Sequence, residues 1–186
     1  MARTIELAVS LKVPDNEARS ALEALTVKMD LGAAVKDLAR ETLWAFDFGD
    51  GSGDPRAAVE RLVRESNVFA NPNKHTYGIV EGGSERGHPL DSDEVAILVR
   101  DRDSNWHASI LPLLRRLGIS GVENVQRWTR WRVRIDPPPS EGDAELVPLL
   151  RKIGVTTGRH DGLLANPHSQ TARAVLPWGD EKPLEP

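Results

Sequence analysis

A four-residue motif occurs twice in this chain of 186 residues. The first copy is Phe69-Ala70-Asn71-Pro72 and the second is Leu164-Ala165-Asn166-Pro167. Each copy is followed by a polar stretch and then by a short apolar run that ends in valine. A segment that returns in both halves of a chain indicates an architecture built from one repeated unit. The rest of the two halves should then match as well.

The first half, residues 1–82, alternates between strand and helix patterns. From Ile5 to Val13 every second residue is apolar, which is typical of a strand with one buried face. Asp54 and Pro55 predict a helix start, because aspartate caps a helix and proline suits its first position. The predicted elements are a strand over 5–13, a helix over 16–28, two strand pieces within 34–48, a helix from Asp54-Pro55 and a strand over 76–80. This β-α-β-β-α-β order is the pattern of a ferredoxin-like unit.

The second half carries matching landmarks in the same order. Its first strand aligns with that of the first half, and its first helix begins at a similar capping pair. An Arg-x-Thr-x-Trp pattern also returns in the strand that follows the helix. The matched residues are Leu7, Val9 and Leu11 with Val95, Ile97 and Val99; Asp15-Asn16 with Asp103-Ser104; and Arg40, Thr42 and Trp44 with Arg127, Thr129 and Trp131.

The sequence therefore predicts an α+β protein of two tandem ferredoxin-like repeats, residues 1–82 and 94–176. Residues 83–93 are rich in Gly, Ser and charge and are predicted to be a linker. A repeat of roughly 80 residues buries only a thin core by itself, so we expect the two to pack as a pseudo-dimer. A loop over 154–162 interrupts the second repeat, and residues 177–186 are predicted to be a flexible tail.

Composition excludes several classes of protein. The net charge of -4 does not favour nucleic-acid binding. The absence of cysteine excludes a disulfide scaffold and a zinc–thiolate site, and it suits a reducing cytoplasm. The N-terminus lacks the apolar segment of a signal peptide, and no apolar run approaches the ~20 residues of a membrane span. We expect a cytoplasmic protein.

The sequence shows no constellation of catalytic residues. The loop over 49–53 has the spacing G-x-G-x-G, which lacks the third glycine of a dinucleotide site and the Lys-Ser/Thr of a P-loop. It is predicted to be a turn rather than a phosphate site. The five histidines include no pair at the spacing that places two metal ligands on one helical face. No metal site is expected.

One strand carries a basic and aromatic face. By period 2, Trp128, Arg130, Arg132 and Arg134 lie on the same side of that strand. On a ferredoxin-like sheet such a face could stack single-stranded RNA. The other interpretation is an exposed face, or one that pairs with acidic residues of a partner.

The repeated unit resembles PurS, the small subunit of phosphoribosylformylglycinamidine synthase in purine biosynthesis. The residues that carry the resemblance are Leu163-Leu164-Ala165-Asn166-Pro167 and Val68-Phe69-Ala70-Asn71-Pro72, with the strand starts at Ile5 and Val95 and the connection Leu117-Gly118-Ile119. The resemblance implies a subunit that associates with itself and bridges a glutaminase and a synthetase subunit, helping ammonia pass between them. The PurS family has no catalytic residue of its own that could be assigned to this chain. PurS proteins are usually single units that dimerise, whereas this chain is two fused units.

The resemblance therefore predicts a non-catalytic subunit of an ATP- and glutamine-dependent ligase complex. ATP and magnesium would be bound by the partner synthetase subunit, not by this chain. The residues predicted to contact partners are Ala70, Asn71, Pro72, Ala165, Asn166 and Pro167. Two alternatives remain: a ferredoxin-like module that binds a small molecule or regulates another protein, and an RNA-binding protein that uses the arginine face.

Overall fold

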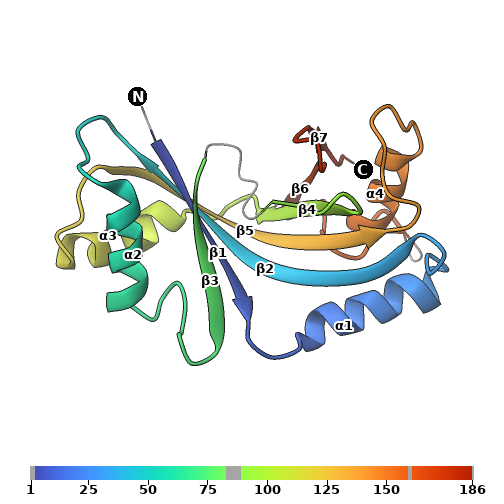
Figure 1. Cartoon of the computed structure of the whole chain (residues 1–186), viewed down its shortest axis with the longest axis horizontal. Coiled ribbons are helices and arrows are strands. Elements are labelled where there is room, and N and C mark those ends of the chain that lie inside the picture. The colour runs from blue at the N-terminus through green and yellow to red at the C-terminus, as the bar shows by residue number, and fades with distance from the viewer. Residues whose placement is uncertain (1–2, 83–88, 159–160, 186) are drawn as a thin grey trace. The chain divides into compact units, whose positions relative to one another are not determined.

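The computed structural model describes residues 3–82, 89–158 and 161–185 of an α+β protein (Figure 1). Among these residues are seven strands in one antiparallel sheet, and four α-helices. The elements are β1 (Arg3–Leu11), α1 (Asn16–Glu23), a π-helical continuation η1 (Ala24–Lys28), β2 (Val35–Phe48), α2 (Pro55–Glu65), β3 (His75–Glu81), β4 (Glu94–Asp101), α3 (Trp106–Arg116), β5 (Val122–Ile135), α4 (Leu146–Gly154), β6 (Gln170–Val175) and β7 (Glu181–Pro183). The strand order is β3-β1-β2-β5-β4-β6-β7.

The long strands β2 and β5 correct the predicted element order. Residues 34–48 do not form two strand pieces; β2 is one strand of 14 residues, and β5 is equally long. No glycine or proline interrupts either segment, so nothing in them favours a chain reversal. The first half is therefore β-α-β-α-β rather than β-α-β-β-α-β.

The chain forms two compact units, and neither is a contiguous half of the sequence. Unit 1 comprises residues 1–13, 42–88 and 104–128, and unit 2 comprises 14–41, 89–103 and 129–186. Helix α1 thus belongs to unit 2 with β4, β6 and α4, and α3 belongs to unit 1 with β1, β3 and α2. The two compact units therefore divide the chain differently from the two repeats expected from the sequence.

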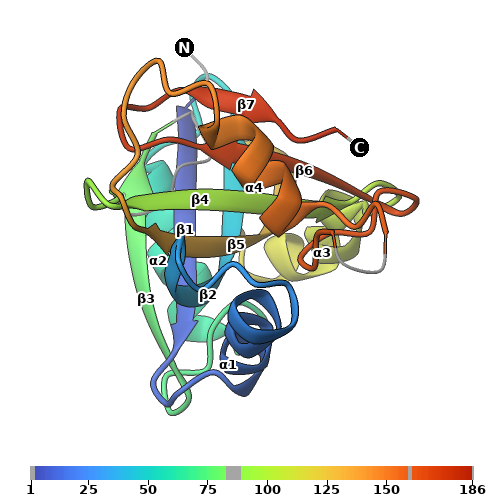
Figure 2. The ribbon, with the colours of Figure 1, turned by 90° about the vertical axis from the view of Figure 1, so that its right-hand side faces the viewer.

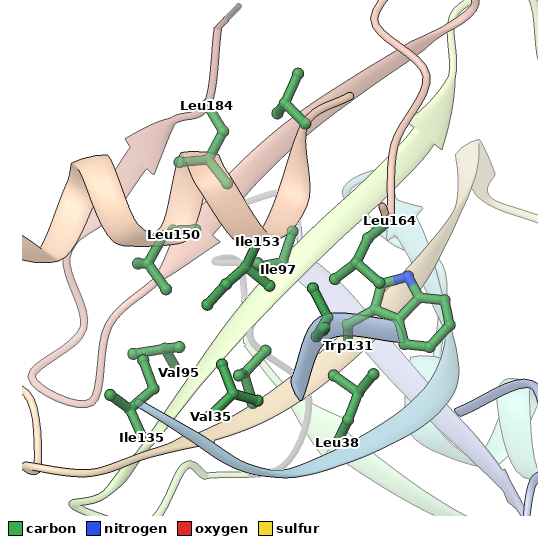
Figure 3. Close-up of a cluster of buried hydrophobic side chains, with 14 of the residues drawn as sticks. Val35, Leu38, Val95, Ile97, Trp131, Ile135, Leu150, Ile153, Leu164 and Leu184 are labelled. Carbon is green, nitrogen blue, oxygen red and sulfur yellow. The ribbon is translucent and has the colours of Figure 1, made fainter. Parts of the chain in front are cut away.

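Each unit has its own hydrophobic core, and each core contains side chains from both halves of the sequence. The core of unit 1 includes Leu7, Trp44, Phe46, Val59 and Phe69 from the first half with Ile110 and Leu114 from α3 and Leu117 at its C-terminal cap. The core of unit 2 includes Leu25, Val35 and Leu38 from the first half with Ile97, Trp131 and Ile153 from the second. Figure 3 shows part of this second core, where Val35 and Leu38 lie beside Trp131 and Ile135.

The first two strands of each half pair in the same register. This register shifts the predicted alignment of the two halves by two residues. Leu7 lies opposite Trp44 in the β1–β2 pair, and Ile97 lies opposite Trp131 in the β4–β5 pair. Leu7 therefore corresponds to Ile97, not to Val95 as predicted. A strand pattern repeats every two residues, so a shift of two leaves the apolar face unchanged and the sequence alone does not reveal it.

The helix caps show the same displacement. Asp15 caps α1, where its carboxylate accepts the N–H groups of Glu17 and Ala18. The cap of α3 is Asn105, whose side chain accepts the Ala108 N–H, so the predicted pair Asp103-Ser104 is wrong by two residues. The predicted start of α2 is confirmed, because Asp54 is its cap and Pro55 its first residue.

The C-terminal segment is not a flexible tail. β7 pairs with β6 along the end of the sheet (Figure 2), and Leu184 beyond it is only 3% exposed. The Leu184 N–H also donates to the Ala172 carbonyl at 3.0 Å. The prediction failed because Leu184 is a single apolar residue among prolines and charges, which carries no periodic signal.

The two remaining irregular segments are described in part. Residues 83–88 of the predicted linker lie outside the described residues, and residues 89–93 lead into β4. In the loop over 154–162, Val155 is buried in the core of unit 2 and forms a parallel bridge with Ala165.

Candidate functional site

The first Asn-Pro motif forms a hydrogen-bonded turn at the start of β3. The Asn71 carbonyl accepts the N–H groups of Lys74 and His75 at 2.9 and 2.8 Å. Its side-chain Oδ1 accepts the Asn73 N–H at 2.9 Å. The Asn71 N–H in turn donates to Nδ1 of His75 at 3.0 Å. Every hydrogen-bonding group described here serves to close the turn.

The second motif forms the same turn at the start of β6. The Asn166 carbonyl accepts the N–H groups of Ser169 and Gln170 at 3.2 and 2.8 Å, and its Oδ1 accepts the His168 N–H at 3.0 Å. The Asn166 N–H donates to Oε1 of Gln170 at 2.9 Å, so the glutamine oxygen takes the role of the histidine nitrogen. The sequence echo therefore encodes one turn, made twice.

Each turn is also tied to the residue that follows the first strand of its half. Lys12 Nζ donates to the Pro72 carbonyl at 2.6 Å, and Arg102 Nη2 donates to the Pro167 carbonyl at 3.2 Å. The predicted contact residues differ in exposure: Ala70 and Ala165 are buried, Asn71 and Pro167 are half-buried, and Pro72 and Asn166 are exposed. The three predicted contact residues of each motif lie together in one turn. Ala70 and Ala165 are buried there, so their side chains are not available to contact a partner.

A groove in unit 1 begins at the first turn. It has a volume of about 680 Å³ and lies between α2 and β3. Its lining residues are Arg56, Glu60, Val63, Arg64, Pro72, Tyr77, Gly78, Ile79 and Val80. The side chain of Tyr77 is 47% exposed. The sequence does not reveal this groove, because the groove depends on how α2 packs against β3 in three dimensions.

The outer edge of β3 is open. β3 stands at one end of the strand order, and no strand among the described residues pairs with that edge. Arg56 Nη1 donates to the Ile79 carbonyl at 3.2 Å and so occupies one of the backbone groups of β3. An unpaired strand edge beside a groove lined by both charged and apolar residues is a template for an added strand.

In unit 2 the chain itself fills the corresponding edge. Gly78 of β3 lies opposite Ala8, and Arg173 of β6 lies opposite Leu98, so β3 and β6 correspond. β7 pairs with β6 through Arg173 and Pro183. The sequence continues into Leu184, which is buried near Gly154 and Ile97. β7 therefore occupies on β6 the edge that is open on β3.

The arginine face of β5 is neutralised by acidic residues of the same chain. The Arg130 side chain is fully buried, and its Nη1 donates to Glu41 Oε2 at 2.9 Å. Arg132 Nε donates to Glu94 Oε2 at 3.2 Å. Burial raises the pKa of Glu94, but hydrogen bonds from Arg132 and the Asp91 N–H outweigh it, so this pKa lies below its usual range.

The third arginine of this face is also paired. Arg134 Nε lies 3.1 Å from Asp93 Oδ2. Of the three arginines, one is buried and two are half-buried beside carboxylates. The acidic residues that pair with this face belong to the chain itself and not to a partner as predicted, and the arrangement gives the RNA-binding alternative no support.

The glycine loop is a structural turn in this fold. The Gly49 N–H donates to the Gly121 carbonyl at 2.9 Å, and the Ser52 hydroxyl donates to the carbonyls of Gly49 and Gly121. Asp54 next to it caps α2. These groups are engaged in holding two loops of unit 1 together rather than arranged around a phosphate.

The remaining candidates do not assemble into a centre. His88 and His160 lie outside the described residues, and among those described no cluster of three His, Asp or Glu side chains could hold a metal ion. The helices in the described parts of the chain are each too short or too polar to cross a membrane. Comparison of the sequence with models of known protein families and with curated proteins gives no match.

Proposed function

We propose that this chain is a non-catalytic bridging subunit of a phosphoribosylformylglycinamidine synthase complex in the cytoplasm. It would consist of two repeats of the PurS type, packed as a pseudo-dimer. It would hold a glutaminase and a synthetase subunit together and aid the transfer of ammonia between them. The chain needs no cofactor for this role, because ATP and magnesium belong to the synthetase subunit.

The internal correspondence between the halves supports the repeat. The two Asn-Pro turns make matching hydrogen bonds, and the strand pairs have matching registers. The hydrogen bonds of the turns and the strand registers thus recur at equivalent positions of the two halves, which is what duplication of one unit produces. Because each core takes side chains from both halves, the two repeats fit a fused dimer better than two independent domains.

The open groove along β3 is the observation that carries the protein-binding role. Its counterpart on β6 already holds an extended segment with a buried leucine. The fold therefore binds an added strand at one of its two corresponding edges, and the other edge has room for a second. Strand addition supplies backbone hydrogen bonds for affinity, and side-chain pockets supply specificity.

A second candidate function rests on a hollow in unit 2. About 480 Å³ of space lies beside α4, lined mainly by apolar residues such as Leu31, Ile135, Pro139 and Leu149. A hollow of this size is in the range that binds small molecules. It supports the alternative of a ferredoxin-like module for a small ligand. Saturable binding of an apolar fluorescent dye, abolished by Leu149→Lys but retained by Tyr77→Ala, would favour this candidate.

The bridging role is tested by reconstitution from purified subunits. The chain is mixed with a glutaminase subunit and a synthetase subunit of formylglycinamide ribonucleotide amidotransferase, and native mass and glutamine-dependent activity are measured. We expect a ternary complex that does not form without the chain. If the two enzymes show no association with the chain, the proposed function is wrong.

Variants then test the groove separately. Tyr77→Ala and Arg64→Glu should each weaken the complex at least tenfold, a change of about 1.4 kcal/mol in binding free energy. Val27→Ala is the matched control, because this side chain is also exposed, by 73%, but lies in unit 2 and outside both Asn-Pro motifs. A complex that tolerates both groove variants as well as the control would place the contact elsewhere.

A further inference from the structure

The guanidinium of an arginine in unit 1 lies over two tryptophan rings. The guanidinium carbon of Arg127 in β5 lies 5.6 Å from the ring centroid of Trp44 and 5.0 Å from that of Trp106. The two indoles meet edge to face, with 5.1 Å between their centroids. Stacking of this kind fixes the plane of a guanidinium and thereby the direction of its N–H groups.

This arginine has no anionic partner among the described residues. Its Nε is buried and has no hydrogen-bond acceptor there. Nδ1 of His107 in α3 is likewise buried without a partner. Buried polar groups of folded proteins are normally paired, so two such atoms in neighbouring elements call for an explanation.

The corresponding arginine in unit 2 shows what the missing partner is. Arg40 begins the same Arg-x-Thr-x-Trp pattern, and its guanidinium carbon lies 5.8 Å from the ring centroid of Trp131. Unlike Arg127, it binds two carboxylates. Its Nε donates to Asp15 Oδ2 at 2.8 Å, and its Nη1 donates to Glu17.

The helix caps explain the difference between the two units. Asp15 is the cap of α1 and Glu17 lies two residues on; the same positions of α3 hold Asn105 and His107. Both acids are thus replaced by residues without a carboxylate, although the arginine and the tryptophan are kept. Unit 1 retains the cation and lacks the anion.

We propose that Arg127, with His107 and Asn105, forms a binding site for a carboxylate supplied from outside the chain. The carboxylate would take the place that Asp15 and Glu17 fill in unit 2 and would accept from the guanidinium. Bidentate pairing of a carboxylate with a stacked arginine combines charge with fixed geometry. The carboxylate comes either from a small molecule or from an acidic side chain of a protein partner. The site does not depend on the groove along β3 or on the bridging role.

The test uses the intrinsic fluorescence of the full chain, because Trp44 and Trp106 adjoin the site. Acetate, succinate and a polyglutamate peptide are titrated at constant ionic strength, with chloride as the reference anion. Saturable quenching by acetate or succinate assigns the site to a small carboxylate. Saturable quenching by polyglutamate alone assigns it to a protein side chain. If no carboxylate differs from chloride, the proposal is overturned.

Three variants make the assignment specific. Arg127→Gln should weaken binding at least tenfold, whereas Arg40→Gln, the matched change in unit 2, should leave it within about twofold of wild type. His107→Glu places a carboxylate where unit 2 has Glu17, so it should abolish binding and raise the Tm of the ligand-free protein. Retained binding in folded Arg127→Gln protein, or a Tm lowered by His107→Glu, contradicts the site.

Discussion

Trp106 meets Trp44 edge to face, with 5.1 Å between the ring centroids. Trp44 lies in β2 of the first half and Trp106 opens α3 of the second, so this contact joins residues from the two halves of the sequence. The same mixing occurs throughout both cores. It means that a half of the chain, taken alone, lacks part of each core.

Separated halves should therefore fold only together. Residues 1–82 alone lack Ile110, Leu114 and Leu117, and residues 94–186 alone lack Leu25, Val35 and Leu38. We expect neither fragment to unfold cooperatively by circular dichroism, and a one-to-one mixture to regain a cooperative transition. A fragment that melts cooperatively by itself, near the Tm of the whole chain, would show that its half is an independent domain.

Truncating Leu184 should destabilise the protein although it lies next to the C-terminus. The side chain is 3% exposed and belongs to the core of unit 2. Leu184→Ala should cost about 2–4 kcal/mol of unfolding free energy. Leu163→Ala, at a leucine that is 41% exposed, should stay within about 0.5 kcal/mol of wild type. Urea denaturation measures both, and equal effects would mean that the C-terminal segment is not docked.

Gly162 should tolerate no side chain. Its φ is 70°, and a Cβ atom there would lie 1.7 Å from the Val155 carbonyl oxygen. Because a backbone atom blocks the space, Gly162→Ala should destabilise by more than about 1 kcal/mol. Gly142→Ala is the control, since Gly142 also has a positive φ but has open space around it. The two variants differ only in crowding, so thermal melts in which they behave alike would rule out the close approach.

Asp15 should make stability depend on pH. Burial raises its pKa, but hydrogen bonds from Arg40 and from the N–H groups of Glu17 and Ala18, and the charge of Arg40, more than compensate. The pKa is therefore lower in the folded state than in the unfolded state. Such a carboxylate stabilises fully above its unfolded pKa of about 3.9, and the stabilisation is lost as the pH falls through the folded value.

Asp15→Asn isolates this effect, because asparagine still caps a helix well. The variant should be less stable than wild type at pH 7, and the difference should shrink as the pH is lowered to 3. Urea denaturation at several pH values gives the comparison. A difference that stays constant with pH would show that the carboxylate and Arg40 do not interact in solution.

Local features of the fold were predictable from the sequence. The start of α2 follows from Asp54 and Pro55, because a capping aspartate and a first-turn proline act on their own neighbours. The Asn-Pro echo was visible as a repeat, and each copy forms a turn that closes through its own backbone and side chain. Signals of this kind need no information from the rest of the chain.

Features that depend on pairing over long distances were not predictable. The shift by two residues between Leu7 and Ile97 preserves the apolar pattern, so only the strand register reveals it. The docking of Leu184 and the stacking of Arg127 on two tryptophans depend on elements far away in sequence. The Arg-x-Thr-x-Trp pattern was visible in both halves. The sequence did not reveal that each arginine stacks on the tryptophan of the other half.

The β7 segment has a consequence for assembly. A sheet with two free ends can add copies at both ends and grow into a filament. Among the described residues the two end strands are β3, with seven residues, and β7, with three residues that end in Pro183. A short edge strand that contains proline resists further pairing, so the longer edge of β3 is the favoured place for a second copy to add.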